Sequence, residues 1–135
     1  MDFNALLVAL DEHIRSIPGD PAPAELFAVR VIAGEVSACY LWSGVARELP
    51  GSVVPPAGCV GIALSTSGWS APMNEGRASL HPQRRRVRSL TLITGAGQDY
   101  TRLESEGEEP QFLSGAVGPV PDLLVGCWSR RLDAA

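Results

Sequence analysis

The sequence contains no lysine, and all 11 of its basic residues are arginines. A P-loop uses a lysine on the nucleotide phosphates, Ser-x-x-Lys hydrolases need a lysine beside the nucleophile, and pyridoxal enzymes need one for the Schiff base. The composition therefore excludes these three classes. Because arginine, alanine, glycine and proline have GC-rich codons, the heavy use of these residues also predicts a bacterial protein from a GC-rich genome.

Histidine and cysteine are scarce as well. The chain has two histidines and three cysteines, with no C-x-x-C or H-x-x-x-H pair: His13, His81, Cys39, Cys59 and Cys127. Protein metal sites need several such ligands at short spacing, so no metal or other cofactor is predicted. The odd number of widely spaced cysteines predicts reduced, mostly buried thiols. No catalytic residue is assigned, and an enzymatic activity is left open but not favoured.

Long hydrophobic runs and a basic N-terminal segment are both missing. No stretch approaches the length of about 18 apolar residues that a membrane-spanning helix needs. The chain begins Met1-Asp2-Phe3-Asn4, whereas a secretory signal begins with basic residues. We therefore expect a cytoplasmic protein that does not contact a membrane.

The chain of 135 residues is 45% hydrophobic and 19% charged, which fits one domain over residues 1–135. The clearest predicted element is a helix over 2–17, capped by Asp2 and ended by Pro18-Gly19. Its apolar residues recur at spacings of three and four: Phe3, Leu6, Leu7, Leu10, Ile14 and Ile17. Asp11, Glu12 and Arg15 are assigned to the opposite, solvent-facing side.

Two apolar runs, 26–32 and 35–42, are separated by Ala33-Gly34 and predict a β-hairpin. One long helix over 25–48 is the alternative, and the sequence leaves it open. The β-branched residues of the first run and the internal glycine favour the hairpin.

Further strands are predicted over 59–66, 84–94 and 98–106, and a C-terminal helix over 121–132. The last two strands form a hairpin around Gly95-Ala96-Gly97. The order α-β-β-β-β-β-α with short connections predicts an α+β domain with a mainly antiparallel sheet of about five strands and both helices on one face.

Four arginines lie within five residues: Arg84, Arg85, Arg86 and Arg88. Alone, they suggest a nucleic-acid or phosphate patch. Counting outward from the turn at 95–97, however, places them opposite 103–109, which contains Glu104, Glu106, Glu108 and Glu109. Opposite charges across paired strands stabilise the sheet by about 0.2–1 kcal/mol each. With a net charge of −4, the sequence favours a charge ladder over nucleic-acid binding.

Trp69 follows an apolar strand, where a large aromatic side chain either closes the core or reaches a partner. Trp42 and Trp128 are assigned to the core or its edge. If Trp69 instead lines a small-ligand or catalytic pocket, the nearest polar candidates are His81, Cys59 and Ser67.

The segments 60–69 and 81–88 carry a resemblance. An apolar strand ending in Trp69, then His81-Pro82-Gln83-Arg84 leading into another strand, resembles small uncharacterised proteins of GC-rich bacteria and their mobile elements. The resemblance implies no known activity, but it implies consecutive strands over 60–106.

Together these features favour a non-enzymatic interaction or accessory domain of a larger bacterial assembly, with a protein partner, either another chain or a second copy. A small-ligand site or enzyme near Trp69 and His81, and nucleic-acid binding through Arg84–Arg88, are the alternatives. The candidate binding residues are Trp69, His81, Arg84, Arg85, Arg86 and Arg88.

Overall fold

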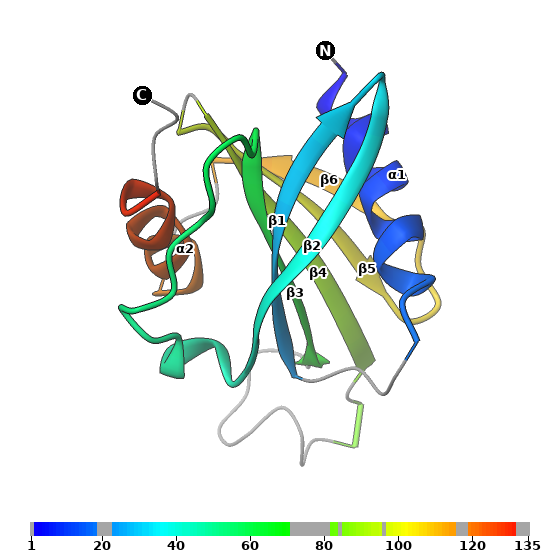
Figure 1. Ribbon diagram of the computed structural model, residues 1–135. Helices are drawn as coiled ribbons and strands as arrows, with labels where there is room; N and C mark the ends of the chain where they lie inside the picture. Colours follow the sequence, from blue (N-terminus) through cyan, green and yellow to red (C-terminus); the bar gives the residue numbers. More distant parts are fainter. Residues whose placement is uncertain are drawn as a thin grey trace.

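In a computed structural model of the chain, an antiparallel sheet of six strands lies between two helices (Figure 1). The structure describes residues 2–18, 23–70, 82–83, 85–95, 97–115 and 119–131. The elements follow in the order α1 (Phe3–Arg15), β1 (Ala24–Ile32), β2 (Glu35–Gly44), the 3-10 turn η1 (Ala46–Glu48), β3 (Gly61–Ser70), β4 (Arg85–Thr94), β5 (Asp99–Ser105), β6 (Gln111–Ser114) and α2 (Pro119–Ser129). The predicted α+β class is confirmed. The sixth strand, β6, was not predicted, because four residues give too short a pattern.

Helix α1 forms where the sequence predicts it. The Asp2 carboxylate caps the helix by accepting hydrogen bonds from the main-chain N–H of Asn4, at 3.0 Å, and of Ala5, at 3.2 Å. The predicted apolar face is buried, while Ile17 lies beyond the helix and is 40% exposed. Asp11 is also buried, at 5% exposure, so its assignment to the solvent side is wrong.

Residues 24–44 form a hairpin, and the alternative of one long helix is wrong. Ala33 and Gly34 both have positive φ, 52° and 81°, and connect the directly paired residues Ile32 and Glu35. A two-residue turn with two positive φ angles matches the twist of the flanking strands. A register shift between Leu26 and Phe27 marks a bulge further along the hairpin.

The strands pair in the order β2-β1-β3-β4-β5-β6, so β2 and β6 are the edges of the sheet. The predicted second hairpin is confirmed, with the Gly97 N–H donating to the Thr94 carbonyl at 2.8 Å. Every pairing is antiparallel.

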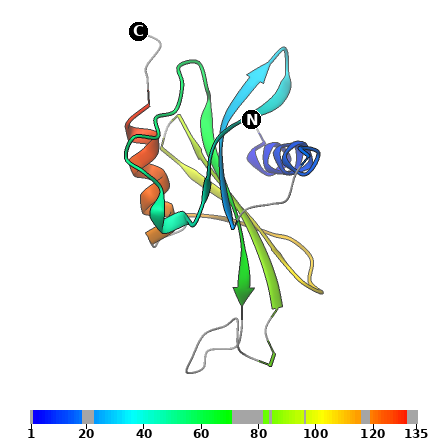
Figure 2. The same ribbon diagram turned by 60° about the horizontal axis from the view of Figure 1, so that its bottom comes forward.

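The two helices lie on opposite faces of the sheet, so their predicted placement on one face is wrong (Figure 2). Leu7 and Leu10 of α1 pack with Phe27 and Val29 on one face, and Leu124 of α2 packs on the other face. Alternate residues of a strand point to opposite faces. Residues 26–29 are all buried and apolar, so both faces of β1 need a cover.

Helix α2 begins at Pro119 and ends at Ser129, earlier at both ends than predicted. Trp128 is 5% exposed in the α2-side core, and Trp42 is partly buried against that core, as predicted. The Arg131 guanidinium lies 4.7 Å from the centroid of a Trp128 ring. No helix among the described residues is long and apolar enough to span a bilayer.

Candidate binding groove

Strands β3 and β4 extend beyond the rest of the sheet. β1 pairs with β3 only as far as Thr66, whereas β3 continues to Ser70 beside β4 (Figure 2). The last main-chain hydrogen bond between β3 and the β1 segment is donated by the Ser67 N–H to the carbonyl of Pro23, the residue before β1, at 2.9 Å. Within the described part of the chain, no strand pairs with β3 on that side beyond Ser67.

A charge network sits where α1 crosses β4 and β5. The carboxylate of Asp11, whose side chain is 8% exposed, forms ion pairs with three arginines: Arg15, Arg88 and Arg102. The Arg15 Nε lies 2.8 Å and the Arg102 Nη1 lies 3.5 Å from Oδ2, and Arg88 binds Oδ1. Asp11 therefore connects one helix to two strands through charge-assisted hydrogen bonds.

Glu104 completes this network. It pairs with Arg15 and with Arg102, the latter at 3.3 Å. Burial lowers the pKa of Arg15, but hydrogen bonds and charges from Asp11 and Glu104 outweigh it and raise that pKa overall. Arg15 thus stays fully charged at any physiological pH.

The predicted cross-strand register is confirmed, but the pairing of charges differs from a simple ladder. Arg88 lies directly opposite Glu104, yet its ion-pair partner is Asp11 on the helix. The docking of α1 therefore redirects the arginine away from its neighbour across the strands.

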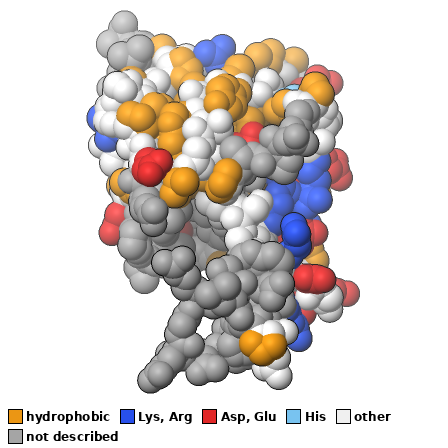
Figure 3. All heavy atoms as spheres, turned by 90° about the horizontal axis from the view of Figure 1, so that it is seen from below, with side chains coloured by type: hydrophobic (Ala, Val, Ile, Leu, Met, Phe, Trp, Pro, Cys, Tyr) orange, Lys and Arg blue, Asp and Glu red, His pale blue; other side chains and the backbone are white. Residues whose placement is uncertain are grey.

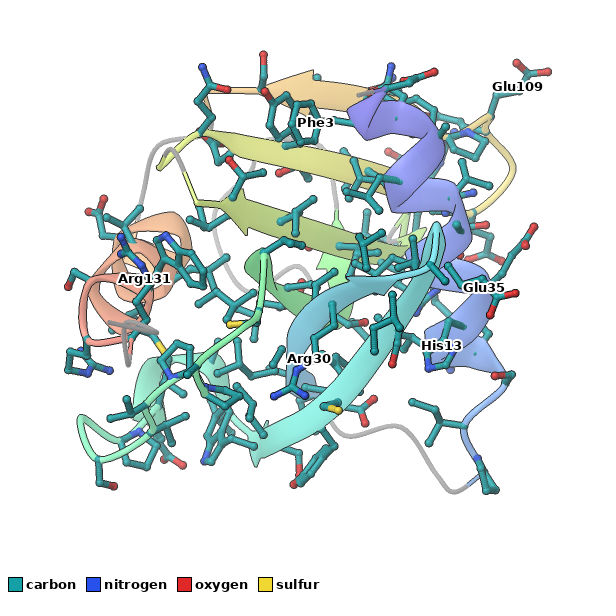
Figure 4. All side chains as sticks on the ribbon, turned by 45° about the horizontal axis from the view of Figure 1, so that its top comes forward. Phe3, His13, Arg30, Glu35, Glu109 and Arg131 are labelled. Carbon is teal, nitrogen blue, oxygen red and sulfur yellow. The ribbon has the colours of Figure 1, made fainter. Side chains whose placement is uncertain are left out.

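At the end of the hairpin the predicted pairing does occur. Arg85 forms an ion pair with Glu108. The contact between Arg86 and Glu106 is not of this kind, because the main-chain N–H of Arg86 donates to a carboxylate oxygen of Glu106, at 3.2 Å. Glu109 was predicted to face the arginines, but Figure 4 places it at the outer tip of the β5–β6 loop.

A groove of about 720 Å³ opens beside this network. It is lined by three arginines, three glutamates and small or apolar residues: Arg15, Arg86, Arg88, Glu104, Glu106, Glu108, Pro23, Ser67, Gly68, Val87, Ser105 and Gly107. Figure 3 shows basic and acidic side chains next to one another on the α1 side of the molecule. The groove thus offers both signs of charge along the projecting end of β3.

Three of the candidate residues lie only partly or not at all in the described part of the chain. The main chain of Trp69 in β3 pairs with that of Arg86 in β4, but the Trp69 side chain is not described. His81 and Arg84 fall outside the described residues. Arg86 and Arg88 line the groove, and Arg85 does not line it but pairs with Glu108, which does.

Of the polar residues named for the alternative pocket, Cys59 and Ser67 are not brought together, while His81 and the Trp69 side chain lie outside the described part of the chain. Cys59 precedes β3 and donates to the Pro56 carbonyl at 3.0 Å, while Ser67 lies near the other end of this strand. At about 3.3 Å per residue the two are more than about 20 Å apart.

The thiols are free, as predicted, but the prediction that most are buried is wrong, because only Cys127 is buried and Cys59 is partly exposed. Burial raises the pKa of Cys59 and of Cys127, and Cys39 is exposed. Among the described residues, no group of histidine, cysteine and acidic side chains gathers as a metal site.

Three residues of the network, Asp11, Arg15 and Arg102, were not singled out by sequence. A usable signal exists for Asp11, which stands four residues after Leu7 and three before Ile14, within the apolar stripe. Comparison of the chain with protein-family models, with curated proteins and with solved structures found no match. The resemblance to small proteins of GC-rich bacteria therefore stays a prediction.

Proposed function

We propose that this chain is a non-enzymatic interaction domain, an accessory part of a larger cytoplasmic assembly in a bacterium, that binds an extended segment of a protein partner in the groove. The observation that carries the proposal is the position of the groove. It lies along the C-terminal end of β3, which continues past the last residue that pairs with β1. Peptides commonly bind by adding a strand to such a sheet edge.

The residues at this edge suit a main-chain partner. Gly68 is exposed, and among the described residues nothing lies within 4 Å of a Cβ atom added there, so the face of β3 is open at this point. At the edge, no described strand pairs with β3 beyond Ser67, and the outward N–H and C=O groups of an edge strand can bond an added backbone.

The charges of the groove favour a segment that carries both acidic and basic residues. Three arginines and three glutamates line the same space, and those at its exposed rim, Arg86 and Glu106, offer a mixed-charge peptide one group of each sign without breaking the network around Asp11. A nucleic-acid backbone has only negative charge and would meet Glu104, Glu106 and Glu108. A protein segment is therefore favoured over DNA or RNA.

The test is selection of peptides from a displayed random library on the full chain, followed by fluorescence anisotropy with the selected peptide. We expect the R86E variant to weaken binding by about tenfold or more, since it reverses one charge in the groove. Because the Ser67 N–H faces the β1 side, the next outward N–H of this edge is that of Trp69. Trp69→Pro, which removes that donor without removing a bond to β4, should weaken binding as well. Arg130→Glu on α2, away from the groove, is the matched control and should leave the affinity unchanged.

Failure to select any peptide, or equal binding by all three variants, would contradict the proposal. So would tight binding of a DNA duplex whose affinity falls steeply with salt and rises when Glu104, Glu106 and Glu108 are changed to glutamine.

A further inference from the structure

We propose that β2 is a self-association edge, along which two copies of this chain pair antiparallel about a two-fold axis at Ala38. This surface is separate from the groove, because β2 and the projecting end of β3 lie on different parts of the sheet. The proposal does not depend on the function proposed above.

The two edges of the sheet are protected to different degrees. β6 has only four residues and follows Pro110, and short strands and prolines are common means of blocking an edge. β2 has ten residues, contains no lysine, arginine or proline, and carries a single charge, on Glu35 at its start. Its bulge lies past Tyr40, so 35–40 is a regular strand, and on its outer side no strand of the described chain pairs with it, while Val36 and Ala38 pack on the α1 face.

The turn determines which main-chain groups of β2 face outward. In a hairpin with a two-residue turn, Ile32 and Glu35 bond each other, and bonded pairs then alternate with non-bonded pairs. The Val29 carbonyl accepts from the Val60 N–H at 2.8 Å, so Val29 of β1 points its main-chain groups toward β3 and not toward β2. This agrees with the alternation counted from the turn. The residues of β2 that point their N–H and C=O groups away from β1 are therefore Val36, Ala38 and Tyr40.

A two-fold axis at Ala38 uses all three of these residues in both copies. It pairs Ala38 with its own equivalent and Val36 with Tyr40 of the second copy, which gives about six main-chain hydrogen bonds. Tyr40 is 58% exposed, and a β-branched residue opposite an aromatic residue is a favourable cross-strand pair. The two side chains that meet at the axis are those of Ala38 in each copy, and they are small enough to lie side by side without a steric clash.

The single charge of β2, on Glu35, is compatible with pairing to a second copy. Because the strands run antiparallel, the two Glu35 carboxylates lie at opposite ends of the pairing, each across from Leu41. No like charges face each other between these ends. An isologous contact of this kind closes after two copies and does not extend into a fibre.

Sedimentation velocity of the full chain over a range of concentrations tests the pairing. We expect a concentration-dependent dimer of twice the 14.3 kDa monomer mass. The Ala38→Pro variant removes an outward N–H without removing a bond to β1, and it should weaken association by about tenfold or more. Cys39→Ser is the control, because it changes an exposed side chain and leaves the main-chain bonds intact.

A cysteine pair tests the register independently and covers the case in which Ala38→Pro does not fold. The axis at Ala38 places Ser37 opposite Cys39 of the second copy as a non-bonded pair, with Cα atoms about 4.5 Å apart, which a disulfide can span. Oxidised Ser37→Cys should therefore form a covalent dimer. The double variant S37C/C39S should not, because its two introduced thiols, one at position 37 of each copy, are on diagonal neighbours about 7–8 Å apart.

Several results would overturn the inference: a wild-type chain that is monomeric at every concentration, a folded Ala38→Pro variant that still dimerises as well as the wild type, or Ser37→Cys cross-linking no better than the double variant.

Discussion

Replacing Asp11 by asparagine removes the carboxylate that connects α1 to β4 and β5. The side chains of Asp11, Arg88 and Arg102 are only 8%, 23% and 15% exposed. Breaking a buried pair by removing one partner costs about 3–5 kcal/mol, because a buried charge is left without compensation. Arg15 is 49% exposed and regains water, and Arg102 keeps Glu104. We therefore expect a loss of about 3 kcal/mol in the free energy of unfolding, at the lower end of that range.

Thermal and urea unfolding followed by circular dichroism measure this loss. A change of about 3 kcal/mol corresponds to a fall in Tm of about 10 °C for a chain of this size. Glu108→Gln is the control, because it breaks the pair between Arg85 and Glu108, whose side chains are 56% and 49% exposed. Exposed pairs contribute at most about 1 kcal/mol, and salt weakens them further.

Asp11→Asn is expected to cost more than Glu108→Gln and to keep its effect at high salt, and the opposite result in either respect would refute this prediction. Either result means that water reaches the carboxylate and that the network does not hold the helix on the sheet.

Three further changes test the turn, the sheet and the thiols. Ala33→Asn should raise stability by about 0.5–1 kcal/mol in urea unfolding, because Ala33 has a φ of 52° and asparagine tolerates positive φ better than alanine; a loss of stability would contradict the turn assignment. Gly61→Ala should cost about 2 kcal/mol or more, because its Cβ would lie 2.2 Å from a carbonyl oxygen of β4, while Gly68→Ala should be close to neutral; equal effects would show that the β3–β4 pairing is wrong. A disulfide reagent at pH 8 should react fast with Cys39 and slowly with Cys59, because burial raises the pKa of Cys59 and leaves less thiolate until the pH rises. Loss of the fast phase in Cys39→Ser checks the assignment, and a fast phase that survives would contradict it.

Local signals predict most of the elements correctly. The Asp2 cap and the apolar stripe predict α1, and Ala33-Gly34 predicts the first hairpin, because caps and tight turns depend on residues next to one another in the chain. What local signals do not contain is the side on which each helix packs. That choice depends on whether both faces of the central strands are apolar, and the unbroken run 26–29 is the signal that indicates it.

In the candidate site, too, the features set by neighbouring residues were predicted from the sequence, and those set by helix docking were not. Counting from the turn at 95–97 correctly places Arg88 opposite Glu104, since a hairpin register follows from its turn. Its actual partner, Asp11, lies 77 residues away in sequence. Which carboxylate an arginine binds depends on how the helix docks across the sheet, and the spacing of charges within one hairpin carries no information on that.

The pairing of Arg88 with Asp11 also determines what the arginine segment can bind. A phosphate that took Arg88 from Asp11 would leave this mostly buried carboxylate with Arg15 and Arg102 alone, and the lost ion pair would offset part of what the phosphate contact contributes. Arg86, by contrast, is exposed at the rim of the groove together with Glu106. A ligand that contacts these rim residues leaves the buried network intact. The arginine-rich segment is thus divided between a residue of the buried network, Arg88, and the rim of the proposed groove, whose mixed charge is one reason for proposing a polypeptide and not a polyanion as its ligand.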